Sequence, residues 1–141
     1  MTGKCYMKKI VNLLIGLFIT LAIAACGGNS SPEAAAKAFT KAVYSGDSQK
    51  VISMIYLSEQ DKKEAGVQDI LSGKIKLIVS HAKEAADKNG GLKNISIEDV
   101  KYDDDKKSAH VQIGVTFKNT EQIKKENVYL IKTDDGWKVK G

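Results

Sequence analysis

The spacing of apolar residues changes at Gly91, and this change limits the possible folds more than any other feature. Before Gly91, apolar residues recur every three or four positions, which is typical of amphipathic helices. After Gly91 they alternate with polar residues, which is typical of strands with one buried face. Helices followed by an antiparallel meander predict an α+β domain, in which N-terminal helices pack on a single antiparallel sheet.

The first predicted helix has a well-defined start. Ser31 suits the N-cap and Pro32 the first helical position, and the helix is expected to run to about Tyr44. Its apolar face consists of Ala35, Phe39, Ala42 and Val43. A break at residues 45–47 then precedes a second, short helix. The apolar residues of that helix are Val51, Ile52 and Ile55.

The longest predicted helix begins at Val67, after a polar connection over residues 57–66, and ends at Asn89 before two glycines. Its expected buried seam follows steps of three and four residues. The members of this seam are Val67, Leu71, Ile75, Ile78, Ala82 and Ala85. His81 lies at the border of the seam.

The segment after Gly91 predicts a meander of short strands. Residues 95–102 change their alternation near Glu98, which predicts a β-bulge and a bent first strand. Residues 109–117 show the clearest alternation, with one apolar and one polar face. A third strand is expected over residues 127–132, and the turn at residues 134–136 leads into Trp137 and the last strand. The strand-forming residues therefore form one sheet with a single buried face.

The N-terminal segment carries the features of an export signal. Lys8 and Lys9 precede an apolar run over residues 10–25 that ends in small residues. The run falls short of the ~20 apolar residues that a transmembrane helix needs, so we expect a cleaved signal. Cys26 directly after residues 23–25 resembles the bacterial lipobox. This resemblance implies that Cys26 is acylated and becomes the mature N-terminus, which anchors the protein to a membrane through lipid.

The predicted organisation is therefore a signal peptide over residues 1–25, a lipidated Cys26 with a flexible tether to Ser31, and one domain over residues 32–141. Residues 1–6 are either part of the signal or an upstream extension, because Met7 places the basic pair at the extreme N-terminus. The expected location is the bacterial cell envelope. No Asp follows Cys26, and in lipoproteins of this type that favours the outer over the inner membrane where two membranes exist.

Composition excludes several functions. All 22 basic residues are lysines, so arginine forks for phosphate or guanine are absent and we expect no nucleic-acid partner. Cys5 lies upstream of the apolar run and Cys26 is the expected lipid attachment point, so the predicted domain has no thiol for a disulfide, a metal or a nucleophile.

Several short segments together resemble a known family. They are a helix start at residues 32–35, a helix break at 45–47, and strand segments at 109–111, 128–130 and 135–139. The chain is similar in these segments to small bacterial lipoproteins of the domain of unknown function 4878 family, in the nuclear transport factor 2-like (NTF2-like) superfamily with its cystatin-like fold. The resemblance implies helices packed into the concave side of a strongly curved sheet, a cone that sometimes encloses a pocket. It carries over no catalytic residue.

Enzymes of the isomerase and dehydratase type in that superfamily place an acid or a histidine inside the cone. His110 falls on the polar face of its strand, which leaves His81 and Asp99, at the suspected bulge, as the nominees for such a site. The sequence identifies a partner for neither of them. We therefore predict no catalytic residue. His81, Tyr102 and Trp137 are the candidates for lining a pocket, and Trp137 is expected to be buried against the helices.

The acidic clusters at residues 103–105 and 134–135 lack the spacing of a calcium loop and suit hairpin turns, so no metal or other cofactor is expected. Three classes of function remain. A non-catalytic envelope module that binds an apolar or amphipathic ligand, or a protein partner, is the favoured one. A small-molecule isomerase or dehydratase and a purely structural lipoprotein are the alternatives.

Overall fold

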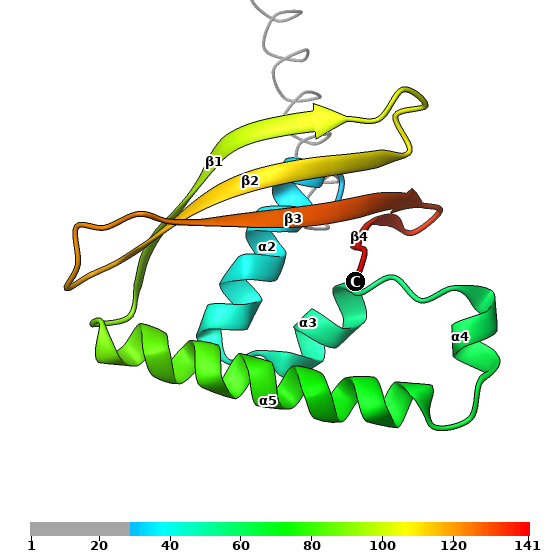
Figure 1. The fold of residues 1–141 in the computed structure, drawn as a ribbon, viewed down its shortest axis with the longest axis horizontal. Coiled ribbons are helices and arrows are strands. Elements are labelled where there is room, and N and C mark those ends of the chain that lie inside the picture. Colours follow the sequence, from blue (N-terminus) through cyan, green and yellow to red (C-terminus); the bar gives the residue numbers. More distant parts are fainter. Residues whose placement is uncertain (1–28) are drawn as a thin grey trace, which may run out of the picture.

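The computed structural model describes residues 29–141, and they form helices followed by a sheet (Figure 1). The helices are α2 (Pro32–Ser45), α3 (Ser48–Met54), α4 (Glu59–Lys63) and α5 (Val67–Lys88). The strands are β1 (Leu92–Tyr102), β2 (Ser108–Phe117), β3 (Lys124–Thr133) and β4 (Gly136–Val139). This order confirms the predicted α+β class and the change of period at Gly91.

The four strands form an antiparallel meander in the order β1-β2-β3-β4. The register of β1 against β2 shifts twice, between Leu92 and Asn94 and between Ile97 and Asp99. The second shift is the β-bulge that the alternation near Glu98 predicts. The register of β2 against β3 is continuous over its whole length.

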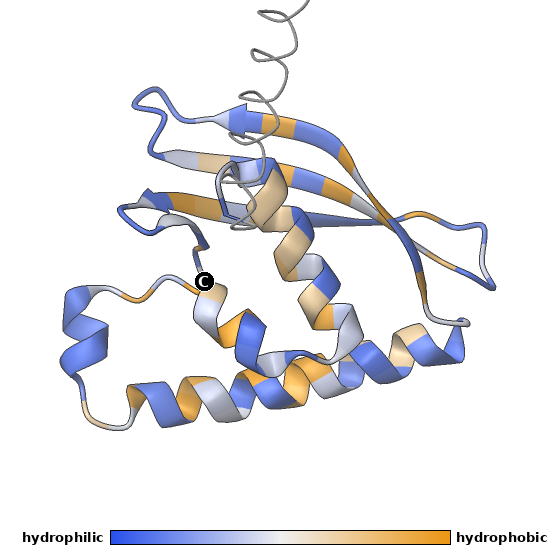
Figure 2. Cartoon of the chain, turned by 180° about the vertical axis from the view of Figure 1, so that it is seen from behind, coloured by the Kyte–Doolittle hydropathy of each residue, from blue (hydrophilic) through white to orange (hydrophobic). Residues whose placement is uncertain are grey.

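The helices occupy one face of the sheet and one side of it. Figures 1 and 2 show α2 lying across one face of the sheet, and α5 running roughly parallel to β3 at the far end of α2. α5 packs mainly on α2 and α3 rather than on the strands. The site described below lies between β3 and α5.

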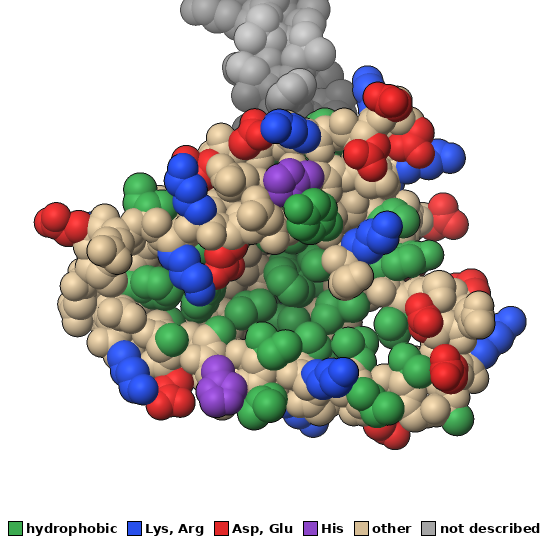
Figure 3. Space-filling model, viewed as in Figure 1, with side chains coloured by type: hydrophobic (Ala, Val, Ile, Leu, Met, Phe, Trp, Pro, Cys, Tyr) green, Lys and Arg blue, Asp and Glu red, His purple; other side chains and the backbone are tan. Residues whose placement is uncertain are grey.

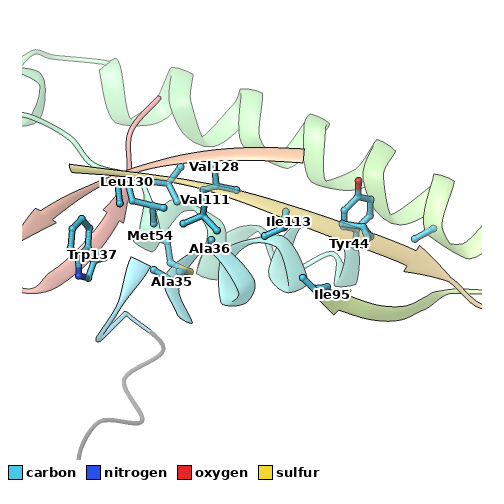
Figure 4. Packing of buried hydrophobic residues seen from close by; sticks show 14 of the residues in the cluster. Ala35, Ala36, Tyr44, Met54, Ile95, Val111, Ile113, Val128, Leu130 and Trp137 are labelled. Atoms are coloured by element: carbon cyan, nitrogen blue, oxygen red, sulfur yellow. The ribbon is translucent and has the colours of Figure 1, made fainter. Parts of the chain in front are cut away.

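The core lies between α2 and the inner face of the sheet (Figure 4). The odd-numbered residues of β2 from Ala109 to Phe117 are buried, as their alternation predicts. Ala35 and Ala36 on α2 are fully buried, and their small side chains allow the helix to lie close to the strands. Each large apolar side chain buried here stabilises the fold by about 1.5–3 kcal/mol.

Local signals fix the two ends of α2. The Ser31 hydroxyl accepts a hydrogen bond from the Ala34 amide at 3.1 Å, and Pro32 occupies the first turn, as expected. Gly46 ends the helix in the left-handed conformation, with φ of 84°. Asp47 then caps α3 by accepting from the Lys50 amide. The predicted break at residues 45–47 is thus confirmed.

The buried seam of α5 differs from the prediction in its second half. Ile78 and Ala85 were expected to be buried, but Ile78 is 56% exposed and Ala85 is exposed as well. Val79 and Ala86 take their places at 2% and 1% exposure. Apolar residues stand side by side at 78–79 and again at 85–86, so the helical period alone fits either choice. The direction in which α2 approaches decides between them.

Candidate binding site

The face of the molecule that Figure 3 shows is hollowed between β3 and α5. Figure 3 shows hydrophobic side chains exposed inside this hollow, with charged side chains around its rim. α2, α3 and α5 meet beside it, where Ala42, Val51 and Val79 are buried and the apolar side chains packed around them are only half-buried. These half-buried residues are Phe39, Val43, Ile55 and Ile75. The helices therefore leave part of the apolar interior open to solvent.

α5 also carries exposed apolar residues. Ile70, Leu77 and Ile78 are all more than half exposed on this helix. Of these, only Ile78 lies next to the inward side that Ile75 and Val79 mark. Single exposed apolar residues are normal, but one at the edge of an apolar hollow extends the surface available for binding. We therefore treat the hollow and the adjoining side of α5 as the candidate binding site.

A polar cluster joins α2 to β3 beside the hollow. The Tyr44 hydroxyl donates a hydrogen bond to Glu126 Oε1 and accepts one from Lys124 Nζ at 3.0 Å. Lys124 Nζ also lies 3.0 Å from Glu126 Oε1, and the Tyr44 ring packs edge-on against Phe117. A pocket lined in part by Phe117, Ile123 and Lys124 adjoins the cluster. The cluster fixes the last turn of α2 to the start of β3.

The surroundings of this cluster shift two pKa values. Burial, followed by the hydrogen bond to Glu126, raises the pKa of Tyr44 above its ordinary value of 10.0. Hydrogen bonds to Tyr44 and Glu126 raise the pKa of Lys124 above 10.5. Tyr44 is thus neutral and Lys124 charged at physiological pH. Sequence reasoning did not find this cluster, because its members are far apart in the chain and follow no motif.

The predicted pocket residues divide between the two ends of α2. Tyr102 and Trp137 come together near Ser31, with their ring centroids 6.1 Å apart. Trp137 is 5% exposed within the core, as expected, whereas Tyr102 is half-exposed and donates a long hydrogen bond to Glu33. His81 is an exposed residue of α5, the helix that packs at the other end of α2. The structure therefore does not bring the three candidates into one pocket.

The face of the sheet turned away from α2 is polar. His110 stacks on Tyr129 with ring centroids 4.6 Å apart, and its Nε2 lies 2.9 Å from Asn127 Oδ1. Asp99 is exposed and lies 3.8 Å from Lys101. His110 thus lies on the solvated face that the alternation predicts. Asp99, at the bulge, pairs with Gln112 and is exposed rather than turned toward the apolar interior.

Two further expectations concern ions and membranes. Among residues 29–141, no group of three His, Cys, Asp or Glu side chains is arranged to hold a metal ion. In the same part of the chain, no helix has both the length and the apolar character to cross a bilayer. The expected signal peptide and the lipidation site Cys26 lie outside the described residues, so their predictions stand untested.

Comparisons with known proteins agree with this architecture. The model of a family described as "Domain of unknown function (DUF4878)" matches residues 24–140. A crystal structure from Campylobacter jejuni named "Putative NTF2-like transpeptidase" is 36% identical, with a TM-score of 0.71, and the match covers 79% of this chain and 99% of that one. No curated protein matches the chain. The helices and the four-stranded sheet therefore form an NTF2-like α+β fold.

Proposed function

The chain belongs to the DUF4878 family, and on this basis we propose that it is a lipid-anchored protein of the bacterial cell envelope that binds a partner without catalysing a reaction. The partner is an apolar or amphipathic molecule that occupies the hollow between β3 and α5. Where the cell has two membranes, the proposed location is the outer one.

The observation that carries this proposal is the apolar hollow itself. Half-buried apolar residues line the junction of α2, α3 and α5, and Ile78 is exposed on the adjoining helix. Covering such surface gains about 25 cal/mol per Å² of apolar area removed from water. A sheet packed fully by its helices would leave no such surface.

The arrangement of polar groups favours binding over catalysis. The name of the Campylobacter jejuni protein suggests transpeptidation, which needs a nucleophile activated by an adjacent base. Within residues 29–141, the serine hydroxyls with hydrogen-bond partners contact backbone groups or carboxylates, and none contacts a histidine or a lysine. His81 and Asp99, the nominees for an isomerase-type site, are both exposed.

The position of the tether supports binding away from the membrane. Asn29, the first described residue, accepts a hydrogen bond from the Trp137 amide at 2.9 Å, next to the start of α2. α2 has 14 residues, so its far end lies about 21 Å from this point. The hollow lies beside that far end. A lipid on Cys26 would therefore leave the hollow facing away from the anchor.

Binding of the fluorescent dye 1-anilinonaphthalene-8-sulfonate tests the role of the hollow. We expect the folded domain, exported without lipid as the Cys26→Ser variant, to enhance the fluorescence of the dye. Adding Ile78→Glu should abolish the enhancement, because it places a negative charge at the edge of the apolar surface and repels the sulfonate of the dye. Ile97→Glu is the matched control, since Ile97 is an exposed isoleucine on β1, two strands away from β3. Equal fluorescence from both glutamate variants would refute the proposed site.

Metabolic labelling tests the anchor. A palmitate analogue should label the wild-type chain and fail to label Cys26→Ser, because Cys26 is the proposed acylation site. Equal labelling of the two chains would end the lipoprotein proposal.

A further inference from the structure

The sheet has three stretches of strand without a neighbouring strand on one side: the outer edges of β1 and β4 and the first half of β3. The first two are protected. The outer edge of β4 is covered by other segments of the chain. The Trp137 amide donates to the Asn29 carbonyl, and the Val139 carbonyl accepts from the Tyr56 amide at 2.7 Å. Ile55 also forms a parallel bridge to Val139. This edge therefore has no room for another strand.

The edge of β1 is protected by its irregularity. The two register shifts in β1 interrupt the regular spacing of its backbone groups. Bulges of this kind twist an edge strand away from a potential partner. β1 is thus a poor template for pairing, although it has 11 residues.

The third edge is the first half of β3, and it is both regular and open. The backbone of Tyr129 points toward β4, because its carbonyl accepts a hydrogen bond from the Lys140 amide. The backbone of Lys132 points toward β2, because its amide donates to the Lys107 carbonyl. The direction alternates from one residue to the next, so the N–H and C=O groups of Lys125 and Asn127 point away from β2, as those of Tyr129 do. The pairing with β4 ends before them, and among the described residues no backbone group pairs with them on this side.

This open edge borders the hollow. β4 follows only the second half of β3 (Figure 1), and Figure 3 shows the hollow beside β3 where β4 would otherwise continue. A strand added to a sheet lies about 4.8 Å from its neighbour. An added strand here would lie between β3 and α5, with every second side chain directed toward the apolar hollow.

The charge next to the open edge is positive. Lys125 lies at one end of the edge and Lys140 at the other, and both side chains are exposed. Neither forms a salt bridge within residues 29–141, whereas Lys124 is neutralised by Glu126. Opposite charges on adjacent strands stabilise a sheet, so this edge favours an acidic strand.

We propose that the open edge of β3 binds an extended segment of a partner protein in which acidic and apolar residues alternate. The peptide backbone pairs with Lys125 and Asn127 by strand addition. Its apolar side chains, opposite Glu126 and Val128, enter the hollow, and its acidic side chains lie on the face that carries Lys125. This inference rests on the proposed function and identifies the class of its partner.

A second copy of the chain fits this edge less well. Pairing two β3 edges would bring the Lys125 side chains of both protomers onto the same face of the joined sheet, and like charges on adjacent strands are destabilising. The acidic partner avoids this repulsion. Dimerisation in solution that is abolished by blocking this edge would therefore overturn the proposal.

The test uses the full-length lipidated protein in detergent micelles and a fluorescein-labelled peptide of six residues in which valine and glutamate alternate. We expect saturable binding by fluorescence anisotropy, with no signal from empty micelles. Lys125→Pro should weaken binding at least about tenfold, because it removes an N–H group that the β2 ladder does not use. Lys125→Ala keeps the N–H group and removes the charge, so it should weaken binding about threefold, a loss that added salt reproduces in the wild type.

Two control peptides separate strand addition from simple adhesion. A peptide N-methylated at alternate backbone amides cannot pair with the edge, and one that alternates valine and lysine has the wrong charge. Neither should bind. Equal binding of the methylated peptide, or Lys125→Pro binding as tightly as the wild type, would overturn the inference. If the anilinonaphthalene dye binds the hollow but the acidic peptide does not bind, this inference is wrong and the proposed function stands. If the dye does not bind, the proposed function itself is wrong.

Discussion

The two ends of α2 are packed in opposite ways. At the N-terminal end, Trp137 is buried, Tyr102 packs edge-on against it, and Asn29 bonds to the backbone of β4. At the C-terminal end, α5 packs on helices and leaves the hollow open beside β3. The first end is closed by side chains and backbone together, whereas the second exposes apolar surface and an unpaired strand edge.

This difference separates stability from binding within one small domain. Fully buried side chains contribute most to stability, whereas half-buried apolar side chains leave surface that a partner can cover. The closed end lies next to the tether and holds α2 on the sheet. The open end can therefore expose apolar surface for a partner while the closed end maintains the fold.

The contrast between the two ends of α2 requires that Trp137, at the closed end, contributes strongly to the free energy of unfolding. Trp137→Ala should lower the free energy of unfolding by about 3–5 kcal/mol, because it removes a large side chain from a packed core. Tyr129→Ala is the control, since Tyr129 is 56% exposed on the polar face, and its loss should stay below about 1 kcal/mol. Urea unfolding of both variants measures the difference. Equal losses would mean that the closed end is not where stability is concentrated.

A polar cluster also contributes to the contrast between the two ends of α2. It consists of Tyr44, Lys124 and Glu126 and links α2 to β3 beside the open end. Tyr44→Phe removes a hydroxyl that bonds both partners, so the free energy of unfolding should fall by about 1 kcal/mol.

The same variant should change the pH dependence of stability. The pKa of Tyr44 is raised in the folded state, so its contribution is complete below the ordinary value of 10.0 and is lost as the pH rises through the raised value. Wild-type stability should therefore fall more steeply above pH 10.0 than that of Tyr44→Phe. Tyr129→Phe, at an exposed tyrosine, controls for the general effect of alkali. Parallel curves for Tyr44→Phe and the wild type would show that the cluster does not stabilise the link.

Most of the fold follows from local patterns in the sequence. The caps at Ser31 and Gly46, the alternation over residues 109–117 and the bulge near Glu98 each have a local cause, and the structure agrees with all of them. Burial of Trp137 was also predictable, because it follows a hairpin turn at the start of a strand with an apolar inner face.

The candidate site was less predictable, since it depends on how elements approach one another. The Tyr44 cluster joins residues about eighty positions apart, and no spacing rule connects them. The open edge of β3 exists because β4 pairs with only part of its neighbour. His81 was a reasonable pocket candidate from the helical period, but its place depends on which side of α5 faces α2.

The smallest expected effect tests which side of α5 faces α2. It compares two adjacent residues of that helix. Ile78→Ala should change the free energy of unfolding by no more than about 0.5 kcal/mol, because the side chain is mostly exposed and alanine favours a helix. Val79→Ala, its matched partner, removes a smaller side chain but should cost about 2 kcal/mol, because Val79 is buried against α2 and α3. Urea unfolding distinguishes the two. A larger loss at Ile78 than at Val79 would mean that α5 turns its other side inward, as the seam predicted from the sequence has it. The hollow would then lose the apolar residue that we assign to its edge.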